Sequence, residues 1–293
     1  MGSYLRPADV PTALAALAGS GPGGSAWTVV AGATDHYPVR VGRVVDEDVL
    51  DVSAIGGLRG ILRVEPGARG LAGGGWRIGA LTTWSDLARA DLPSSFDGLR
   101  AAARAVGGRQ VQNRATLAGN VCNASPAADG VPNLLALDAV VELASSLGVR
   151  QVPVGAFVTG NRRTVRAPDE LVTGILVPSP LAGSAVRSTF GKLGARAYLV
   201  ISIAMVAAVV ETDGGGRIQR ARIAVGACSE VAQRLTALEA ELVGRRLDGA
   251  VSRIVAPDHL AALAPITDVR ATAAYRRSAA LVLVRRALQE LAA

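Results

Sequence analysis

Cysteine, histidine, lysine and aromatic residues are all scarce in this sequence. Two cysteines and two histidines cannot complete the clustered ligand sets that zinc and iron–sulfur sites need. With His36 and His259 as the only histidines, a Ser-His-Asp triad has few bases to draw on, and no G-x-S-x-G elbow occurs. We therefore expect no metal site and no catalytic side chain, so a cofactor would have to carry any chemistry.

Long hydrophobic runs are also missing. The longest, "LVISIAMVAAVV" at 199–210, is too short to cross a bilayer as a helix and predicts a buried strand. The chain does not open with the basic, apolar and small-residue regions of a signal peptide, and CxxC is absent. These features favour the cytoplasm and exclude a membrane span.

Basic residues outnumber acidic ones, but they are dispersed. The net charge is +7 and the pI is near 10.3, which would ordinarily suggest an anionic partner. Because the arginines form only short pairs and no aromatic residues interleave with them, nucleic-acid binding is disfavoured. Lys192 is the only lysine among 31 basic residues, and lysine and arginine are not interchangeable where a compact, flexible donor is needed.

What the sequence does contain is half hydrophobic residues, with only 3% aromatics and 34 glycines. A core of Ala, Val and Leu with tight turns is expected, in one large or two to three small units. Strands and helices alternate up to a boundary near 180–186. Beyond it, strands are followed by three helical stretches, near 229–243, 249–263 and 268–292, the last capped by Asp268. This order predicts an α+β fold.

Two segments of small residues carry the strongest functional pattern. "AGATD" follows a strand predicted at 27–30, and "ATLAGNVCNASPAAD" follows a predicted helix. Without bulky side chains, backbone N–H groups can approach an anion closely, and the Thr, Asn, Ser and Asp side chains can bond sugar hydroxyls or phosphate oxygens. A diphosphate is the ligand that suits both segments. Neither segment matches a Rossmann or P-loop motif. Tight packing between strands would explain either segment alone.

Six ordered blocks, "VVAGATDHYP", "IGALTTWSDLA", "VQNRATLAGNVCNASPAADGVPNLLALDA", "FVTGNRRTVRAPDELVTGILVP", "FGKLGARAYLVISIAMVAA" and "AVGACSEVAQRLTALEAELVG", span nearly the whole chain. Together they resemble the FAD-binding medium subunit of the molybdenum hydroxylases, the family of xanthine, carbon monoxide, nicotine and aldehyde dehydrogenases. The resemblance implies a vanillyl-alcohol-oxidase-like FAD-binding domain at 1–180, with subdomains of about 1–55 and 56–180. It also implies a C-terminal domain at 186–293 with a three-stranded antiparallel sheet and helices.

The resemblance also assigns FAD contacts to particular residues. Lys192 would lie near the pyrimidine edge of the flavin, where a cation stabilises negative charge on the reduced ring and so tunes the redox chemistry of the flavin. A strand near the flavin ring would supply Val172 and Thr173. The remaining expected contacts come from a first loop, residues 30–36, and a second loop, residues 115–129: Val30, Ala31, Gly32, Ala33, Thr34, Asp35, His36, Thr116, Ala118, Gly119, Asn120, Asn123, Ser125 and Asp129.

The chain departs from the family pattern in three places. Ala33 and Ala118 stand where the family has glycine, and a methyl group there is tolerated if φ is negative but narrows the approach of the phosphates. Val106 stands near a position where some relatives place an aromatic residue over the flavin.

The resemblance implies an electron-transfer role in a larger complex. This subunit would take electrons from iron–sulfur clusters on a [2Fe-2S] small subunit and pass them through FAD to NAD or another acceptor. A separate molybdopterin-containing large subunit would choose the substrate. Two alternatives stay open: a stand-alone flavin reductase of the same fold, and a scaffold subunit that has lost its flavin.

Overall fold

The computed structural model describes residues 2–19, 26–44, 46–197 and 199–293, and the predicted Gly-rich linker at 20–25 lies outside them. The N-terminal part is a small parallel sheet in the order β1-β3-β2. Helix α1 covers it, begins where Asp9 accepts a hydrogen bond from Thr12 N–H, and ends at Gly19 as predicted. The elements are β1 (Tyr4–Leu5), α1 (Val10–Ala18), β2 (Thr28–Val30) and β3 (Val49–Asp51).

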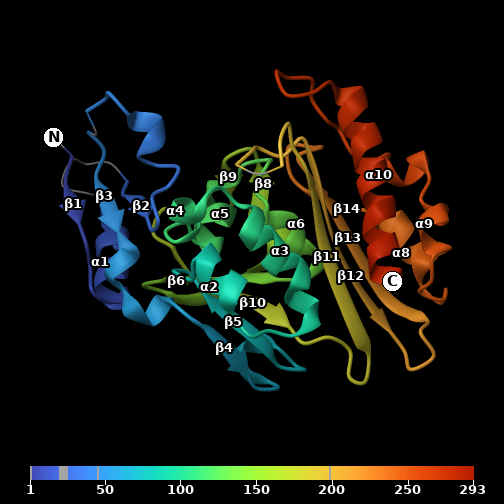
Figure 1. Cartoon of the computed structure of the whole chain (residues 1–293). Helices are drawn as coiled ribbons and strands as arrows, with labels where there is room; N and C mark the ends of the chain where they lie inside the picture. Colours follow the sequence, from blue (N-terminus) through green and yellow to red (C-terminus); the bar gives the residue numbers. More distant parts are fainter. Residues whose placement is uncertain (1, 20–25, 45, 198) are drawn as a thin grey trace.

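An antiparallel five-stranded sheet forms the middle of the molecule, in the order β4-β5-β10-β6-β7 (Figure 1). Its central strand β10 is buried from Leu171 to Val177, as its near-continuous apolar sequence requires. The strands are β4 (Ile61–Val64), β5 (Gly75–Gly79), β6 (Val140–Ser145), β7 (Gly148–Pro153) and β10 (Leu171–Pro178), and a separate hairpin joins β8 (Val158–Gly160) to β9 (Arg163–Thr164).

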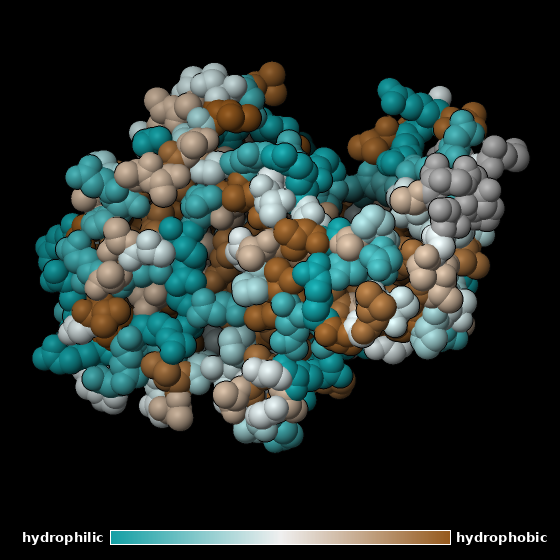
Figure 2. All heavy atoms as spheres, turned by 180° about the vertical axis from the view of Figure 1, so that it is seen from behind, coloured by the Kyte–Doolittle hydropathy of each residue, from teal (hydrophilic) through white to brown (hydrophobic). Residues whose placement is uncertain are grey.

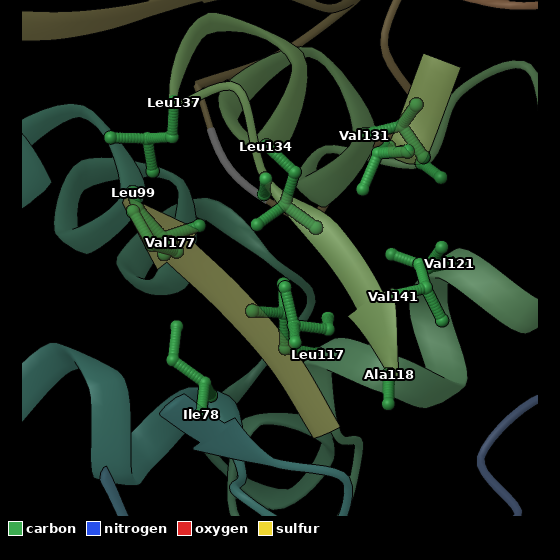
Figure 3. Packing of buried hydrophobic residues seen from close by; sticks show 14 of the residues in the cluster. Ile78, Leu99, Leu117, Ala118, Val121, Val131, Leu134, Leu137, Val141 and Val177 are labelled. Atoms are coloured by element: carbon green, nitrogen blue, oxygen red, sulfur yellow. The ribbon is translucent and has the colours of Figure 1, made fainter. Parts of the chain in front are cut away.

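Helices pack between this sheet and the C-terminal one. The predicted start of α2 is confirmed, because Thr83 and Asp86 form a reciprocal capping box. Figure 3 shows the packing beneath these helices, where side chains of α5 and α6 meet those of β5, β6 and β10. The helices are α2 (Trp84–Arg89), α3 (Asp97–Ala105), α4 (Arg109–Gln112), α5 (Leu117–Asn123), α6 (Gly130–Ala136) and α7 (Val154–Phe157).

The C-terminal sheet is antiparallel in the order β11-β12-β13-β14. Alternate residues of β12 face opposite ways: Ala207 and Val209 join the core under α3 and α6, whereas Val206 and Val210 pack against α10. Its elements are β11 (Ala185–Leu193), β12 (Ala204–Thr212), β13 (Ile218–Gly226), β14 (Gln233–Arg234), α8 (Thr236–Leu242), α9 (Val251–Ile254) and α10 (Ala273–Ala292).

Several sequence-based expectations for the C-terminal part were wrong. The predicted three-stranded sheet has a fourth, two-residue strand, β14, because residues 233–234 pair with β13 instead of continuing a helix from 229. The predicted helix at 249–263 is divided into α9 and a 3-10 turn at Pro257–Leu260. Thr272 caps α10 in place of Asp268, whose carboxylate instead binds the Arg276 side chain at 2.7 Å.

The surface is mixed in character. On the face shown in Figure 2, brown apolar residues form patches separated by teal polar ones. Within the described ranges, no helix has the length and apolar character needed to span a membrane. The apolar run at 199–210 forms the buried strand β12 only from Ala204 onward, whereas Leu199 and Ile201 before it are exposed.

Candidate functional site

The first loop leaves β2 and folds tightly against the backbone of the second. A Cβ atom on Gly32 would lie 2.0 Å from the carbonyl oxygen of Arg114, so only glycine allows this approach. In the part of the chain that the structure describes, the N–H groups of residues 32–36 donate no hydrogen bond to protein. Successive backbone N–H groups without protein acceptors are the kind of donors that bind anions.

The second loop folds largely as helix α5, whereas its small residues had predicted a loop. Thr116 starts the helix, because its Oγ1 accepts a hydrogen bond from Gly119 N–H at 2.9 Å. Ala124 ends it in the left-handed conformation, with φ of 48°. The N–H of Leu117 donates to Thr82 O at 3.2 Å, so the start of α5 is fixed to the turn before α2.

Two direct contacts bring the loops together. Besides the approach of Gly32 to Arg114, the side-chain amide of Asn123 donates to the carboxylate of Asp35. The first loop therefore runs along α5 from its beginning to its end. The two segments of small residues thus lie against each other, and Figure 1 shows α5 beside the segment that follows β2.

Asn120 connects the second loop to α6. Its Oδ1 accepts a hydrogen bond from Gly130 N–H at 3.0 Å, and a Cβ on Gly130 would lie only 2.7 Å from that oxygen. The Nδ2 group of Asn120 has no protein acceptor among the described residues. Asn120 therefore keeps two donors for a ligand while its oxygen is held in place.

Asp129 and Lys192 meet across the two halves of the chain. Nζ of Lys192 donates to Oδ2 of Asp129 at 2.7 Å, and Oγ of Ser202 donates to Oδ1 at 2.9 Å. Burial raises the pKa of the Asp129 carboxyl above its usual value, and the neighbouring Lys192 opposes that rise. The only lysine of the chain thus compensates a buried carboxylate at the predicted site.

A pocket of about 220 Å³ lies beside Lys192. Small and apolar residues form most of its wall, with Lys192 and Arg196 as the charged groups, and it is lined by Ala101, Ala105, Phe190, Lys192, Gly194, Arg196, Ala197 and Val200.

Val172 and Thr173 are buried in β10, at a point where its pairing with β6 skips one residue. The Thr173 hydroxyl donates to Oε1 of Glu142 at 2.9 Å, so this side chain already has a partner inside the protein. Its carbonyl accepts from Ala80 N–H at 3.1 Å and from Arg77 at 2.8 Å. Residues 80–83 lead into α2, and Thr82 O accepts the hydrogen bond from Leu117 N–H at the start of α5, so backbone hydrogen bonds connect this bulge to the second loop.

Ala33 and Ala118, the two alanines at family glycine positions, differ in conformation. Ala33 has φ of 56°, the left-handed region that glycine favours, so the substitution is strained there. Ala118 has no positive φ, and the residue is 4% exposed and belongs to the hydrophobic core (Figure 3). Ala118 therefore meets the condition under which a methyl group is tolerated at this position, whereas Ala33 does not.

His36 ends the first loop in an unusual setting. Its Nε2 is buried without a hydrogen-bond partner and lies 3.7 Å from Oε1 of Glu47. Desolvation lowers the pKa of His36, and the nearby Arg40 adds to that lowering. Among the remaining predicted residues, Oγ of Ser125 accepts a hydrogen bond from Ala127 N–H. Val30 is the last residue of β2, and Ala31 packs against the core of the N-terminal part.

Sequence reasoning missed two residues of this site. Ser202 holds the second oxygen of Asp129, and it is the one polar residue of the run at 199–210, a signal that could have identified it. Arg162 donates to Oδ1 of Asn123 from the turn between β8 and β9. No spacing pattern predicts that contact, since 39 residues separate the two.

The donor set fits a diphosphate cofactor and not a metal. Five free amides, the Asn120 amide group and Lys192 are all hydrogen-bond donors, which suits phosphate oxygens and a polar ring edge. Among the described residues, no group of three or more His, Cys, Asp or Glu side chains is placed to hold a metal ion.

Comparison with known families agrees with this geometry. Residues 1–180 match the model of the FAD-binding domain in molybdopterin dehydrogenase, and residues 190–291 match that of the carbon monoxide dehydrogenase flavoprotein C-terminal domain. The chain belongs to this family of FAD-binding oxidoreductase subunits, and its cofactor is FAD. The resemblance inferred from the sequence blocks is confirmed.

Individual relatives are similar along almost their whole length. The glyceraldehyde dehydrogenase medium chain of Sulfolobus acidocaldarius is 29% identical, with 99% of this chain and 98% of the relative covered. The carbon monoxide dehydrogenase medium chain of Afipia carboxidovorans is 31% identical, with 98% and 95% covered. A structure of reconstituted CO dehydrogenase from Oligotropha carboxidovorans superposes with a TM-score of 0.87 at 28% identity, covering 100% and 97% of the chains.

Proposed function

We propose that this chain is the electron-transfer subunit of a multi-subunit molybdenum hydroxylase. It takes electrons from iron–sulfur clusters of a small partner subunit and passes them through FAD to NAD or another acceptor. A molybdopterin-containing large subunit completes a heterotrimer in the cytoplasm. The observation that carries the proposal is the meeting of both small-residue loops and the Asp129–Lys192 pair at one site.

The residues of the site divide the work of holding the cofactor. The five free amides of residues 32–36 bind the diphosphate, and the Nδ2 group of Asn120 donates to it or to the adjoining polar chain. Lys192, held by Asp129, would place a positive charge near the pyrimidine edge of the ring, where it would favour the more negative reduced form. When bound, FAD supplies the one- and two-electron chemistry that the side chains lack.

The finer fold assignment belongs to the same proposal. The FAD-binding domain at 1–180 is vanillyl-alcohol-oxidase-like, with one subdomain of about 1–55 containing the small parallel sheet and another of about 56–180 containing the five-stranded sheet. The C-terminal domain at 186–293 contributes Lys192 and Ser202. The cofactor would then bind where the first subdomain, the second subdomain and the C-terminal domain meet.

A visible absorption spectrum tests the proposal. The full-length chain, purified with its co-expressed partners, is expected to carry flavin absorption that a partner's substrate bleaches and an added acceptor restores. No flavin after purification, together with no uptake of added FAD, contradicts the proposal and leaves the scaffold alternative. Retained flavin with substrate turnover by this chain alone would favour a stand-alone reductase, which needs a proton donor beside the ring.

A comparison of NAD with artificial acceptors in the same assay identifies the natural electron acceptor.

A further inference from the structure

Arg162 lies at the turn between β8 and β9 and is anchored twice to the end of α5. Its backbone N–H donates to Ala124 O at 2.8 Å, and its guanidinium donates to Oδ1 of Asn123. The hairpin therefore reaches the second loop through both main chain and side chain, although 39 residues separate Arg162 from Asn123.

Asn123 also contacts the first loop, through Asp35. A carboxylate can only accept hydrogen bonds and a guanidinium can only donate them. The amide of Asn123 is therefore oriented with its NH₂ group toward Asp35 and its oxygen toward Arg162, as both contacts require. We call Asp35, Asn123 and Arg162 the relay, since together they connect the first loop, α5 and the β8–β9 hairpin.

Three residues at or near the relay have a strained backbone conformation. Ala33, Ala124 and Arg162 have φ of 56°, 48° and 56°, the left-handed conformation that residues with a side chain rarely adopt. Each of them is a relay residue or lies within two positions of one. Such strain persists only where the surroundings over-determine the conformation, and it is concentrated at ligand-binding sites.

The relay also offsets a negative charge in the first loop. The first loop offers five free N–H donors to an anion, yet the exposed carboxylate of Asp35 lies in the same loop. An uncompensated carboxylate there would repel the diphosphate of FAD. Through the oriented amide of Asn123, the positive charge of Arg162 is placed to compensate Asp35.

We propose that Arg162 is a positioning residue of the cofactor site, acting through Asn123 to hold and neutralise Asp35 so that the first loop accepts an anion. The inference rests on the proposed binding of FAD by this site. It adds the β8–β9 hairpin, which no small-residue pattern marks, to the parts of the chain that determine FAD affinity.

The neighbouring Arg163 provides a matched control. It pairs with Glu230 at 3.0 Å, and both side chains are mostly exposed, at 68% and 58%. Arg162→Gln and Arg163→Gln remove the same charge from adjacent positions, so a difference between them reports on the relay and not on net charge.

The test is a titration of FAD into the full-length apoprotein, followed by flavin fluorescence at low and high salt. We expect Arg162→Gln to weaken binding roughly tenfold at low salt, as one uncompensated charge near an anion would. The loss should shrink at high salt because ions screen exposed charges. Arg163→Gln should stay within about twofold of the wild type, since Arg163 pairs with Glu230 and not with a relay residue.

Two further variants separate compensation of charge from simple support of the fold. Adding Asp35→Asn to Arg162→Gln should restore the affinity of the Asp35→Asn single variant, because the repelling carboxylate is gone. Arg162→Lys keeps the charge and should show no additional salt dependence, which preserves the test if Arg162→Gln fails to fold.

Several results would overturn the inference. Unchanged affinity in Arg162→Gln, or a loss that is independent of salt and is not rescued by Asp35→Asn, would each do so. Wild-type protein that takes up no FAD would instead refute the proposed function, so the two failures are distinguishable.

Discussion

Asp129 and Lys192 form a buried ion pair in which Oδ2 and Nζ are 2.7 Å apart, although 63 residues separate them in the sequence. Asp129 directly precedes α6, and Lys192 lies on β11, so the pair joins the segments matched by the two different family models. Their side chains are only 6% and 13% exposed. The proposed cofactor site would therefore depend on the docking of the C-terminal sheet as well as on its own loops.

Removing Lys192 should make stability depend on pH in a predictable direction. Lys192→Met leaves the Asp129 carboxylate buried with Ser202 as its remaining partner, and we expect a loss of about 3 kcal/mol in the free energy of unfolding at pH 7. The folded-state pKa of Asp129 is already raised, so the folded state binds a proton more readily than the unfolded state, and acidification relieves the cost. Urea unfolding at pH 7 and pH 5.5 measures both effects.

Lys192→Arg is the control for that prediction, since it keeps a positive charge beside Asp129. It should retain most of the stability, with little change in pH dependence. An equal loss at both pH values in Lys192→Met would show that packing, and not the unpaired carboxylate, explains the effect.

The two alanines at family glycine positions should respond in opposite directions to glycine. Ala33→Gly relieves a left-handed conformation, and we expect a gain of about 0.5 kcal/mol after the higher entropy of unfolded glycine is counted. Ala118→Gly removes a buried methyl group from a helix and should cost about 1 kcal/mol or more. Chemical denaturation of the apoprotein checks both, and the same sign for both would contradict the assignment.

Local signals in the sequence predicted the elements that depend on neighbouring residues. The capping box of Thr83 and Asp86 and the glycine that ends α1 involve contacts within a few positions, so sequence spacing is sufficient. The family blocks added the site loops and Lys192. The helix predicted from 229 failed because residues 233–234 pair with β13, and strand pairing can override helical periodicity.

Contacts between distant segments could not be predicted. Ser202 became a partner of Asp129, and Arg162 a partner of Asn123, only when separate elements packed together. The conformation of the two alanines was also beyond the sequence, because the sign of φ at Ala33 depends on how the first loop turns against residues 114–115. Residue type alone therefore predicted the kind of site but not which substitution strains it.

The oxygen and the NH₂ group of the Asn120 side chain should have separate roles, one in stability and the other in ligand binding. Asn120→Asp keeps an oxygen to accept from Gly130 N–H but replaces the free NH₂ donors by a negative charge. We expect the stability of the apoprotein to change by less than about 1 kcal/mol, while FAD affinity falls by about tenfold or more. Asn120→Leu should lose both. Unchanged FAD affinity in the Asp variant would remove Asn120 from the site.

His36 should make the first loop sensitive to acid. Desolvation lowers its folded-state pKa below that of the unfolded chain, so the unfolded state binds the proton first as the pH falls through about 6.5. The wild type should therefore lose stability between pH 7 and pH 5, and His36→Gln should remove that part of the loss.

Titration of the neighbouring Glu47 does not interfere with this measurement. Its hydrogen bonds from Thr28 and Arg40 outweigh the opposing effect of burial and lower its pKa, so it stays ionised until lower pH. Asp129 contributes with the opposite sign in the same range, but it is common to both proteins and cancels in the difference. Thermal unfolding of wild type and variant at pH 5, 6 and 7 gives that difference directly. If the two curves stay parallel across this range, protonation of His36 is not coupled to the folding of the first loop.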